Sequence, residues 1–497
     1  MTVLTQQLRY YNAVRVRAIP LAYVLLASCV SIGAFMRFWQ IGTRPGWDWD
    51  EPVYANIAGN VAAHGTIILK PNYGMTPVPW LYHPPFHFLF VGAWFREVGS
   101  GVTQERVWGA GMALIALTLL FFALRAMLGS NRALLVSGLL LIDTWMVYAN
   151  RVSSIENTLM VLIVLSIWMY GRASYNPTKT RYIVAGVFVG ATVCYKFTGA
   201  YIVLAVLINW LITRQKKTNR LHLMMLGATA SVVVLYFGVM TIISWGNGDN
   251  SFWQDNAVQL QRTIGLHGNR GSLDGAMAMI SPLFHQYRVF IGTILVAGAS
   301  ALLVIWRLIQ CFKLRSWQPV RQHSLLFAWA LASIIAFGSI GLKFPTYFQL
   351  LLVPLYVYLV AELSEKFVKV ETAPRLRVLL SSALVVLVAL SMLGFKWRIV
   401  DHDDNAMKST QQYAELHIPR DAIVLAEESV GTIIPQQYCN IYNAWSCGKV
   451  ASYIITYSSQ QHPVPDNSAF RQLLARSKEV TSFTGFKETI TVRKIIP

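Results

Sequence analysis

Long apolar segments separated by short polar stretches dominate the first 400 residues. Most approach the roughly 20 residues that a helix needs to cross the hydrocarbon core of a bilayer. A shorter apolar stretch, 84–98, is predicted to be an interfacial or re-entrant helix, because counting it as a crossing would invert every positive loop that follows. We predict eleven crossings, near residues 19–40, 107–127, 132–149, 157–172, 182–195, 198–213, 222–245, 286–308, 325–341, 347–363 and 377–396.

The last hundred residues follow a different pattern. Short alternating segments begin at Asp421, Ala451 and Glu488 and are typical of strands, whereas Phe470 to Ser477 is typical of a helix. The chain therefore divides into a transmembrane domain, 1–396, and a small soluble α/β domain, 397–497. The fold class is a polytopic α-helical membrane protein with about 11 to 13 transmembrane helices and two long outer loops, 41–83 and 246–285.

Composition and charge agree with a membrane protein. Hydrophobic residues make up 55% of the chain and charged residues 13%, about half the charged share of soluble domains. The chain has a net charge of +19, and its positive excess lies in the first 400 residues, where short loops between apolar segments carry it. This distribution follows the positive-inside rule, so nucleic acid is excluded as a partner. We predict a multi-pass plasma-membrane protein with a cytoplasmic N-terminus, an uncleaved signal anchor and an extracytoplasmic C-terminal domain.

Cysteine usage adds little. Cys439 and Cys447 lie eight positions apart in the C-terminal domain, where either a disulfide or two free thiols would fit. The chain has no cysteine or histidine spacing typical of zinc.

The first outer loop gathers three acidic residues, Asp48, Asp50 and Glu51, next to Trp47 and Trp49. Pro52 and the apolar residues that follow it predict that a helix starts here at the membrane surface. Asp50 either only caps this helix, or is a partly desolvated carboxylate that can deprotonate a hydroxyl group.

Further charged residues are predicted on the outer face. His83 precedes two prolines and either shapes a turn or contacts a substrate. Arg151 and Glu156 lie at the junction of two crossings. They either mark a substrate path or form a structural ion pair that joins the two helices. Lys196 and Lys343, the latter close to Tyr347, interrupt apolar runs and would either bind a lipid phosphate or extend to the interface. His267 and Arg270 lie in the second long loop.

Taken in order, these elements resemble one family. They resemble the motifs of the protein O-mannosyltransferases: Asp50-Glu51, His83-Pro84-Pro85, the stretch from Asp143 to Glu156 and Tyr195-Lys196-Phe197-Thr198-Gly199. More broadly, they resemble the GT-C glycosyltransferases that use polyprenyl-phosphate sugars, which include the lipid A aminoarabinose transferases. Position 81 is Leu where the mannosyltransferases commonly have an acidic residue. His83 stands where the aminoarabinose transferases usually have Lys.

The resemblance implies an outer-face, inverting transfer from a polyprenyl-phosphate sugar, mannose or a similar hexose, to a hydroxyl group of a protein, glycan or lipid. Asp50 would be the base, Asp48 its substitute and Glu51 an orienting or acceptor-binding residue. Arg151, Lys196 and Lys343 would stabilise the leaving phosphate. The remaining predicted substrate-binding residues are His83, Glu156, Tyr347, His267 and Arg270.

Two questions stay open at this stage. No cofactor is certain, and a divalent cation held by Asp50, His83 or His267 is left open. The alternative function is a lipid or solute transporter that uses the same outer-face charges for passage instead of chemistry.

Overall fold

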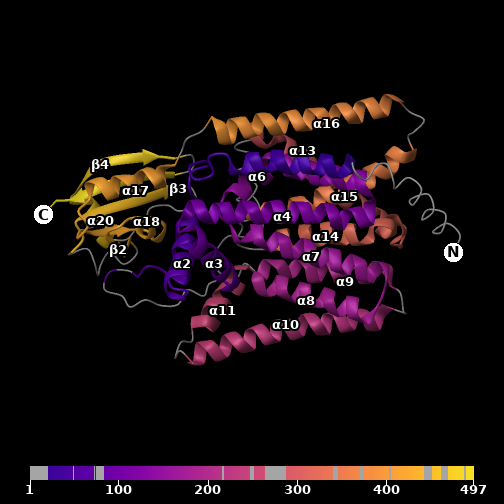
Figure 1. The fold of residues 1–497 in the computed structure, drawn as a ribbon, viewed down its shortest axis with the longest axis horizontal. Helices are drawn as coiled ribbons and strands as arrows, with labels where there is room; N and C mark the ends of the chain where they lie inside the picture. Colours follow the sequence, from indigo (N-terminus) through magenta and orange to yellow (C-terminus); the bar gives the residue numbers. More distant parts are fainter. Residues whose placement is uncertain are drawn as a thin grey trace.

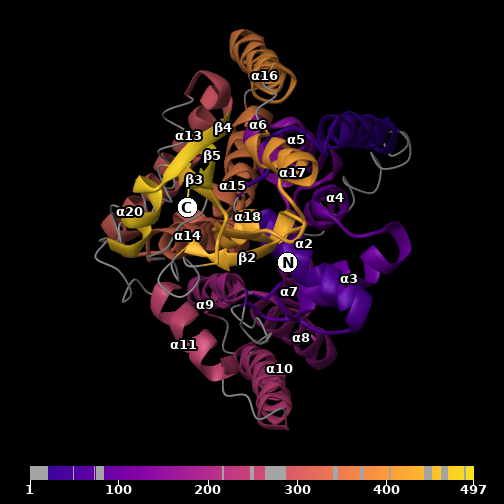
Figure 2. The same ribbon diagram turned by 90° about the vertical axis from the view of Figure 1, so that its left-hand side faces the viewer.

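The computed structural model describes residues 21–48, 50–71, 73, 83–214, 218–246, 251–263, 287–339, 345–369, 374–401, 405–441, 450–459, 468–485 and 488–496. Its helices run side by side in a long bundle, with an α/β domain at one end (Figure 1). Seen from that end, α10 and α16 flank the bundle at opposite edges (Figure 2).

In the part that the structure describes, each of the eleven apolar segments predicted from the sequence is mainly helical. By length and composition, seven described helices can cross a membrane, or eight if a bent pair is counted as one span; the number of crossings stays a prediction. The helices that correspond to the eleven predicted segments are, in order, Leu21–Phe38, α4 (Val102–Leu128), α5 (Ser130–Ile142) with α6 (Thr144–Arg151), α7 (Ile155–Tyr175), α8 (Lys179–Tyr195), α9 (Tyr201–Thr213), α10 (Asn219–Gly246), α13 (Tyr287–Lys313), α14 (Ser324–Ser339), α15 (Phe348–Lys369) and α16 (Pro374–Phe395).

The bend between α5 and α6 is 59° and centres on Asp143. Its carboxylate accepts a hydrogen bond from the backbone N–H of Met146 at 2.9 Å and therefore caps α6. The hydroxyls of Thr293 and Tyr356 each donate to the other carboxylate oxygen at 2.6 Å. This buried carboxyl is thus fully used in fixing the break, and every residue of α6 is buried.

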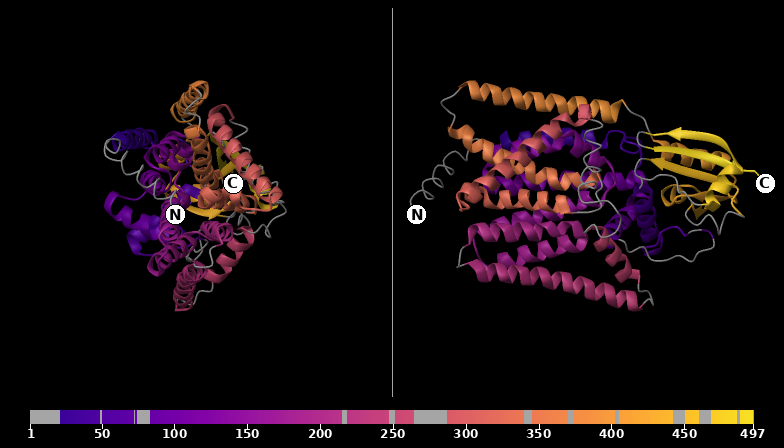
Figure 3. Two further views of the ribbon diagram at one scale, coloured as in Figure 1. Left: turned by 90° about the vertical axis from the view of Figure 1, so that its right-hand side faces the viewer. Right: turned by 180° about the vertical axis from the view of Figure 1, so that it is seen from behind.

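Three helices lie at the end of the bundle nearest the α/β domain (Figures 1 and 3). They are α2 (Asp50–His64), α3 (Phe86–Val98) and α11 (Ser251–Thr263). All three come from stretches predicted to be outside the membrane or at its surface. The remaining short elements are η1 (Phe197–Ala200), η3 (Gln318–His323), η4 (Pro345–Tyr347) and η5 (Lys396–Val400).

The C-terminal domain contains a five-stranded sheet in the order β2-β1-β3-β5-β4. Strand β1 pairs in parallel with β2 and β3, whereas β5 pairs antiparallel with β3 and β4. The predicted strands and helix correspond to β1, β3, β5 and α20. The elements are α17 (Ala406–His417), β1 (Ile423–Ala426), α18 (Glu428–Ile433), β2 (Gln437–Asn440), β3 (Tyr453–Ser459), α20 (Ser468–Ala475), β4 (Ser477–Thr484) and β5 (Glu488–Ile495).

One hydrophobic core joins this domain to the first outer loop. Trp47 and Ala58, with Val91 of α3, pack in the same cluster as Val430 and Tyr438 of the α/β domain. The domain is therefore docked on α2 and α3. Cys439 is disulfide-bonded, whereas Cys447 lies outside the described residues.

Candidate functional site

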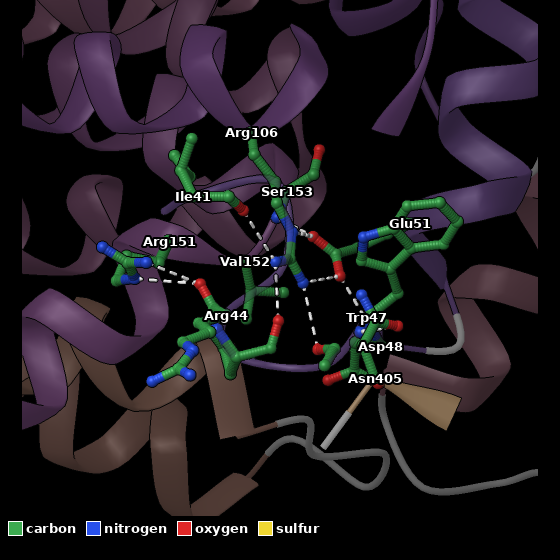
Figure 4. A network of polar contacts seen from close by, with 12 residues as sticks. Ile41, Arg44, Trp47, Asp48, Glu51, Arg106, Arg151, Val152, Ser153 and Asn405 are labelled. Carbon is green, nitrogen blue, oxygen red and sulfur yellow. Dashed lines mark hydrogen bonds and ion pairs between the residues drawn. The ribbon is translucent and has the colours of Figure 1, made fainter. Parts of the chain in front are cut away.

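The two adjacent acids at the start of α2 have different surroundings. Glu51 is fully buried and forms a two-pronged ion pair with Arg106 of α4, with N···O distances of 2.7 and 2.6 Å. The backbone N–H groups of Asp48 and Ser153 also donate to its carboxylate, at 2.7 and 2.5 Å (Figure 4). Glu51 is therefore fully occupied in holding the loop, which fits the orienting role among those predicted for it.

Arg106 completes this fixed network. Besides Glu51, its guanidinium donates to the carbonyls of Ile41, Pro45 and Gly46 at 2.7–3.0 Å, so each of its five N–H groups has an acceptor. The sequence interpretation did not identify Arg106. A basic residue at the outer end of an apolar helix, against the positive-inside bias, was the signal that could have found it.

Arg151 lies at the junction of two helices, where it was predicted, but its contacts differ from the predicted ones. Its guanidinium is fully buried, and all five N–H groups donate to backbone carbonyls, those of Met36, Arg37, Trp39 and, twice, Arg44, at 2.6–3.1 Å. Arg151 thus caps the end of the helix Leu21–Phe38 and holds the turn after it. Figure 4 shows its contact with Arg44 in that turn. It has no donor left for a phosphate, and the predicted Arg151–Glu156 pair does not form, because Glu156 pairs with Lys196.

Arg151→Lys is expected to destabilise the protein by about 3 kcal/mol, because an ammonium has three donors and buried carbonyls would lose theirs. The protein that remains folded should keep the wild-type KM for the sugar donor. Thermal unfolding in detergent measures the first effect, with Arg172→Lys at an exposed position as the control. A raised KM with unchanged stability would instead return Arg151 to the substrate site.

Lys196, Glu156 and Tyr347 form a second buried cluster. Lys196 lies in the break between α8 and η1 and is 5% exposed. Its ammonium forms an ion pair with Glu156, at the start of α7, and lies 4.9 Å from the ring centre of Tyr347, at the end of η4. The structure thus brings together three residues that the sequence separated by up to 191 positions.

The break that carries Lys196 needs a small residue nearby. A Cβ at Gly199 would approach the carbonyl oxygen of Thr192 to 2.8 Å and the Leu159 side chain to 3.2 Å. Only glycine lets the chain turn back this closely against α8. The Thr198-Gly199 part of the predicted motif therefore serves to present Lys196.

Asp50 faces this cluster. The pKa of its carboxyl is raised to about 7, chiefly by burial and also by the nearby Asp48 and Glu156 carboxylates, against the opposing effects of the Lys196 ammonium and a Tyr54 hydrogen bond. A carboxyl with such a pKa is half ionised near neutral pH, which suits a general base. Asp48 lies beside it, with its N–H bound to Glu51.

Two histidines connect the first outer loop to this cluster. The hydroxyl of Tyr54 lies 3.1 Å from Nε2 of His83, which places the predicted His83 one step from Asp50. His87 lies 3.1 Å from the Tyr195 hydroxyl and 3.3 Å from the Glu105 carboxylate. Burial, and then the Lys196 charge, lowers the pKa of His87 to about 3. A neutral His87 that donates to Glu105 accepts from Tyr195 and so orients the neighbour of Lys196.

A groove opens beside Tyr347, between η1, α9, α14 and α15. Most of its lining surface is apolar, and four of its residues carry hydroxyl groups: the lining is Thr198, Tyr201, Ser333, Ala336, Phe337, Tyr347, Leu350 and Leu351. Its composition suits a hydrocarbon chain whose polar end lies near Lys196.

The predicted residues therefore separate into three groups. Asp48, Asp50, His83, Glu156, Lys196 and Tyr347 surround one site, while Glu51 and Arg151 support it from behind. Lys343, His267 and Arg270 lie outside the described residues. Within the described part of the chain, no group of three or more His, Cys, Asp or Glu side chains could hold a metal ion; the divalent cation stays an expectation from the sequence.

Comparisons with known proteins bear on the fold that holds these residues. Residues 82–245 match the model of the dolichyl-phosphate-mannose-protein mannosyltransferase family. A structure of ArnT from Cupriavidus metallidurans bound to undecaprenyl phosphate has a TM-score of 0.61 at 15% identity, covering 95% of this chain and 97% of that one. The Archaeoglobus fulgidus oligosaccharyltransferase has a TM-score of 0.55 at 12% identity, covering 87% of this chain and 67% of that one. A search of curated proteins gives no match.

The resemblance to the GT-C glycosyltransferases is thus confirmed. The chain is a multi-span membrane protein with their fold and a small C-terminal sheet domain.

Proposed function

We propose that this protein transfers a monosaccharide, mannose or a similar hexose, from a polyprenyl-phosphate donor to a hydroxyl group of a protein, glycan or lipid on the outer face. The observation that carries the proposal is the position of Asp50, a carboxyl with a pKa of about 7, facing the buried Lys196–Glu156 pair. The undecaprenyl phosphate bound to the similarly folded ArnT supports the donor class.

The donor would lie with its prenyl chain in the groove beside Tyr347 and its phosphate near Lys196. An ammonium has three N–H groups, and the contacts with Glu156 and with the Tyr347 side chain use two of them. The Tyr347 ring, 4.9 Å from the ammonium, and Glu156 restrict the position of the Lys196 chain. A cation held in place before the reaction stabilises developing phosphate charge without reorganisation.

The reaction is a single displacement with inversion. The acceptor oxygen attacks the anomeric carbon while its proton passes to the Asp50 carboxylate. The bond between the anomeric carbon and the phosphate oxygen breaks, and its electron pair leaves with the polyprenyl phosphate. That phosphate gains one negative charge, next to Lys196. Asp48 and Glu156 keep the Asp50 carboxyl basic enough to take the proton.

Membranes that contain the protein test the donor and the acceptor class together. They would receive a set of polyprenyl-phosphate sugars, each labelled in the sugar, with polyprenyl-phosphate mannose first. We expect label to move from the donor into one fraction, protein, glycan or lipid, at a rate that depends on expression of the chain. Label that stays in the donor for every sugar would contradict the proposal.

A further inference from the structure

The first outer loop is fastened to the α/β domain at one lysine. The Lys70 ammonium donates to three carbonyls, those of Gly431, Ile434 and Gln436, at 3.1, 2.8 and 2.9 Å. These carbonyls belong to the last turn of α18 and the stretch after it. Lys70 therefore caps the negative end of a helix in another domain, with every N–H of its ammonium occupied.

The backbone near this contact is also held by hydrogen bonds. The N–H of Lys70 donates to the Asn56 side chain of α2 at 2.8 Å, and its carbonyl accepts from the Tyr438 hydroxyl at 3.2 Å. Farther along, the N–H of Tyr73 donates to the Tyr438 carbonyl at 2.8 Å. Since Tyr438 lies on β2, at the edge of the sheet, Lys70 and Tyr73 lie against that edge.

This position matters because of what the loop connects. The helix α2 begins with Asp50 and ends at His64, and the loop after it passes Lys70 and leads to His83. Both ends of this segment therefore reach the site, whereas its middle is held by the α/β domain. The elements of the proposed donor site, η1, α14 and α15, have none of these contacts with Lys70 among the described residues.

We propose that Lys70 is a positioning residue that docks the first outer loop on the α/β domain and so sets the acceptor side of the site. This inference rests on the proposed function. The α/β domain would then help to position Asp50 and His83, through its contacts with the loop that connects them. Loss of the ammonium would loosen the loop and weaken use of the acceptor, while binding of the donor would stay the same.

Lys70→Met tests the proposal, because it keeps most of the side chain and removes its three donors. Lys478→Met, at an exposed position on β4 of the same domain, is the matched control. Hydrogen exchange at the Tyr73 amide in the full-length protein reports docking. We expect exchange about tenfold faster or more in Lys70→Met, since hydrogen bonds from a charged donor are lost, and the wild-type rate in Lys478→Met.

Kinetics provide the second measurement. In Lys70→Met, kcat/KM for the acceptor should fall by about tenfold, with the KM of the donor within about twofold of wild type. Lys70→Arg, which keeps a cationic donor, should recover part of both effects. Unchanged exchange at Tyr73 would overturn the proposal, as would faster exchange with normal acceptor kinetics or an equal loss for donor and acceptor. If the wild-type protein transfers no sugar, the proposed function fails, and the exchange result alone decides whether Lys70 docks the loop.

Discussion

Asp50→Asn is expected to lower sugar transfer by about 10²- to 10⁴-fold, the usual contribution of a general base. The amide is nearly the same size, so the loop and the Glu51–Arg106 pair behind it should keep their geometry. Transfer rates per folded molecule, at equal expression of the two proteins, measure the effect. A mutant with the wild-type rate would remove Asp50 from the mechanism and make Asp48 the next residue to test.

The pH dependence of kcat/KM tests the role of Asp50 independently. The base acts in its ionised form, so wild-type kcat/KM should rise with pH and level off above about 7, where burial has moved the pKa of Asp50. The residual activity of Asp50→Asn should lack this rise. A wild-type profile that is flat from pH 5 to 8 would contradict the assignment.

The stability of the folded protein should fall over the pH range in which the activity rises. In the unfolded chain the Asp50 carboxyl ionises near its ordinary pKa of 3.8, whereas in the folded protein it ionises near 7. Ionisation therefore costs the folded state stability as the pH rises between these values. Asp50→Asn should be at least as stable as wild type above pH 7, which shows that its loss of activity is not a loss of folding.

Lys196→Met is expected to have the second large effect, a fall in transfer of about 10²- to 10³-fold, because the leaving phosphate loses its stabilising charge. It should also destabilise the protein by about 3 to 5 kcal/mol, since the Glu156 carboxylate is left buried without its partner. The double variant Lys196→Met with Glu156→Gln removes both charges. It should recover most of the stability and none of the activity.

A second ion pair serves as the control. Arg307 of α13 pairs with Glu362 of α15, away from the site. Arg307→Met should lower stability with a normal transfer rate per folded molecule. If the double variant at Lys196 and Glu156 regains activity along with stability, the pair is structural and the phosphate is bound elsewhere.

Much of the fold could be predicted because bilayer thickness sets the length of an apolar segment. The helix at Asp50 was predictable for a similar reason, since Pro52 and the apolar positions after it mark a helix start. In the α/β domain the apolar strands β1, β3 and β5 were identified. The strands β2 and β4 were not identified: β2 has only four residues, and β4 carries mostly polar residues at the exposed edge of the sheet.

The roles of adjacent residues were harder to predict. Asp50 and Glu51 differ by one position, and a helix turns by about 100° at each residue. Only the packing of α4 against the loop decides that Glu51 meets Arg106 while Asp50 faces Lys196. Arg151 shows the same limit, because its acceptors are backbone carbonyls, which carry no signal in the sequence.

The most direct test of the central claim uses purified protein in liposomes with sugar-labelled polyprenyl-phosphate hexose and the acceptor fraction found in membranes. The account predicts that the wild-type protein forms a product whose anomeric configuration is opposite to that of the donor, and that Asp50→Asn forms almost none. Label that crosses the bilayer still attached to its lipid, with no glycoside formed, would contradict the account and favour a transporter.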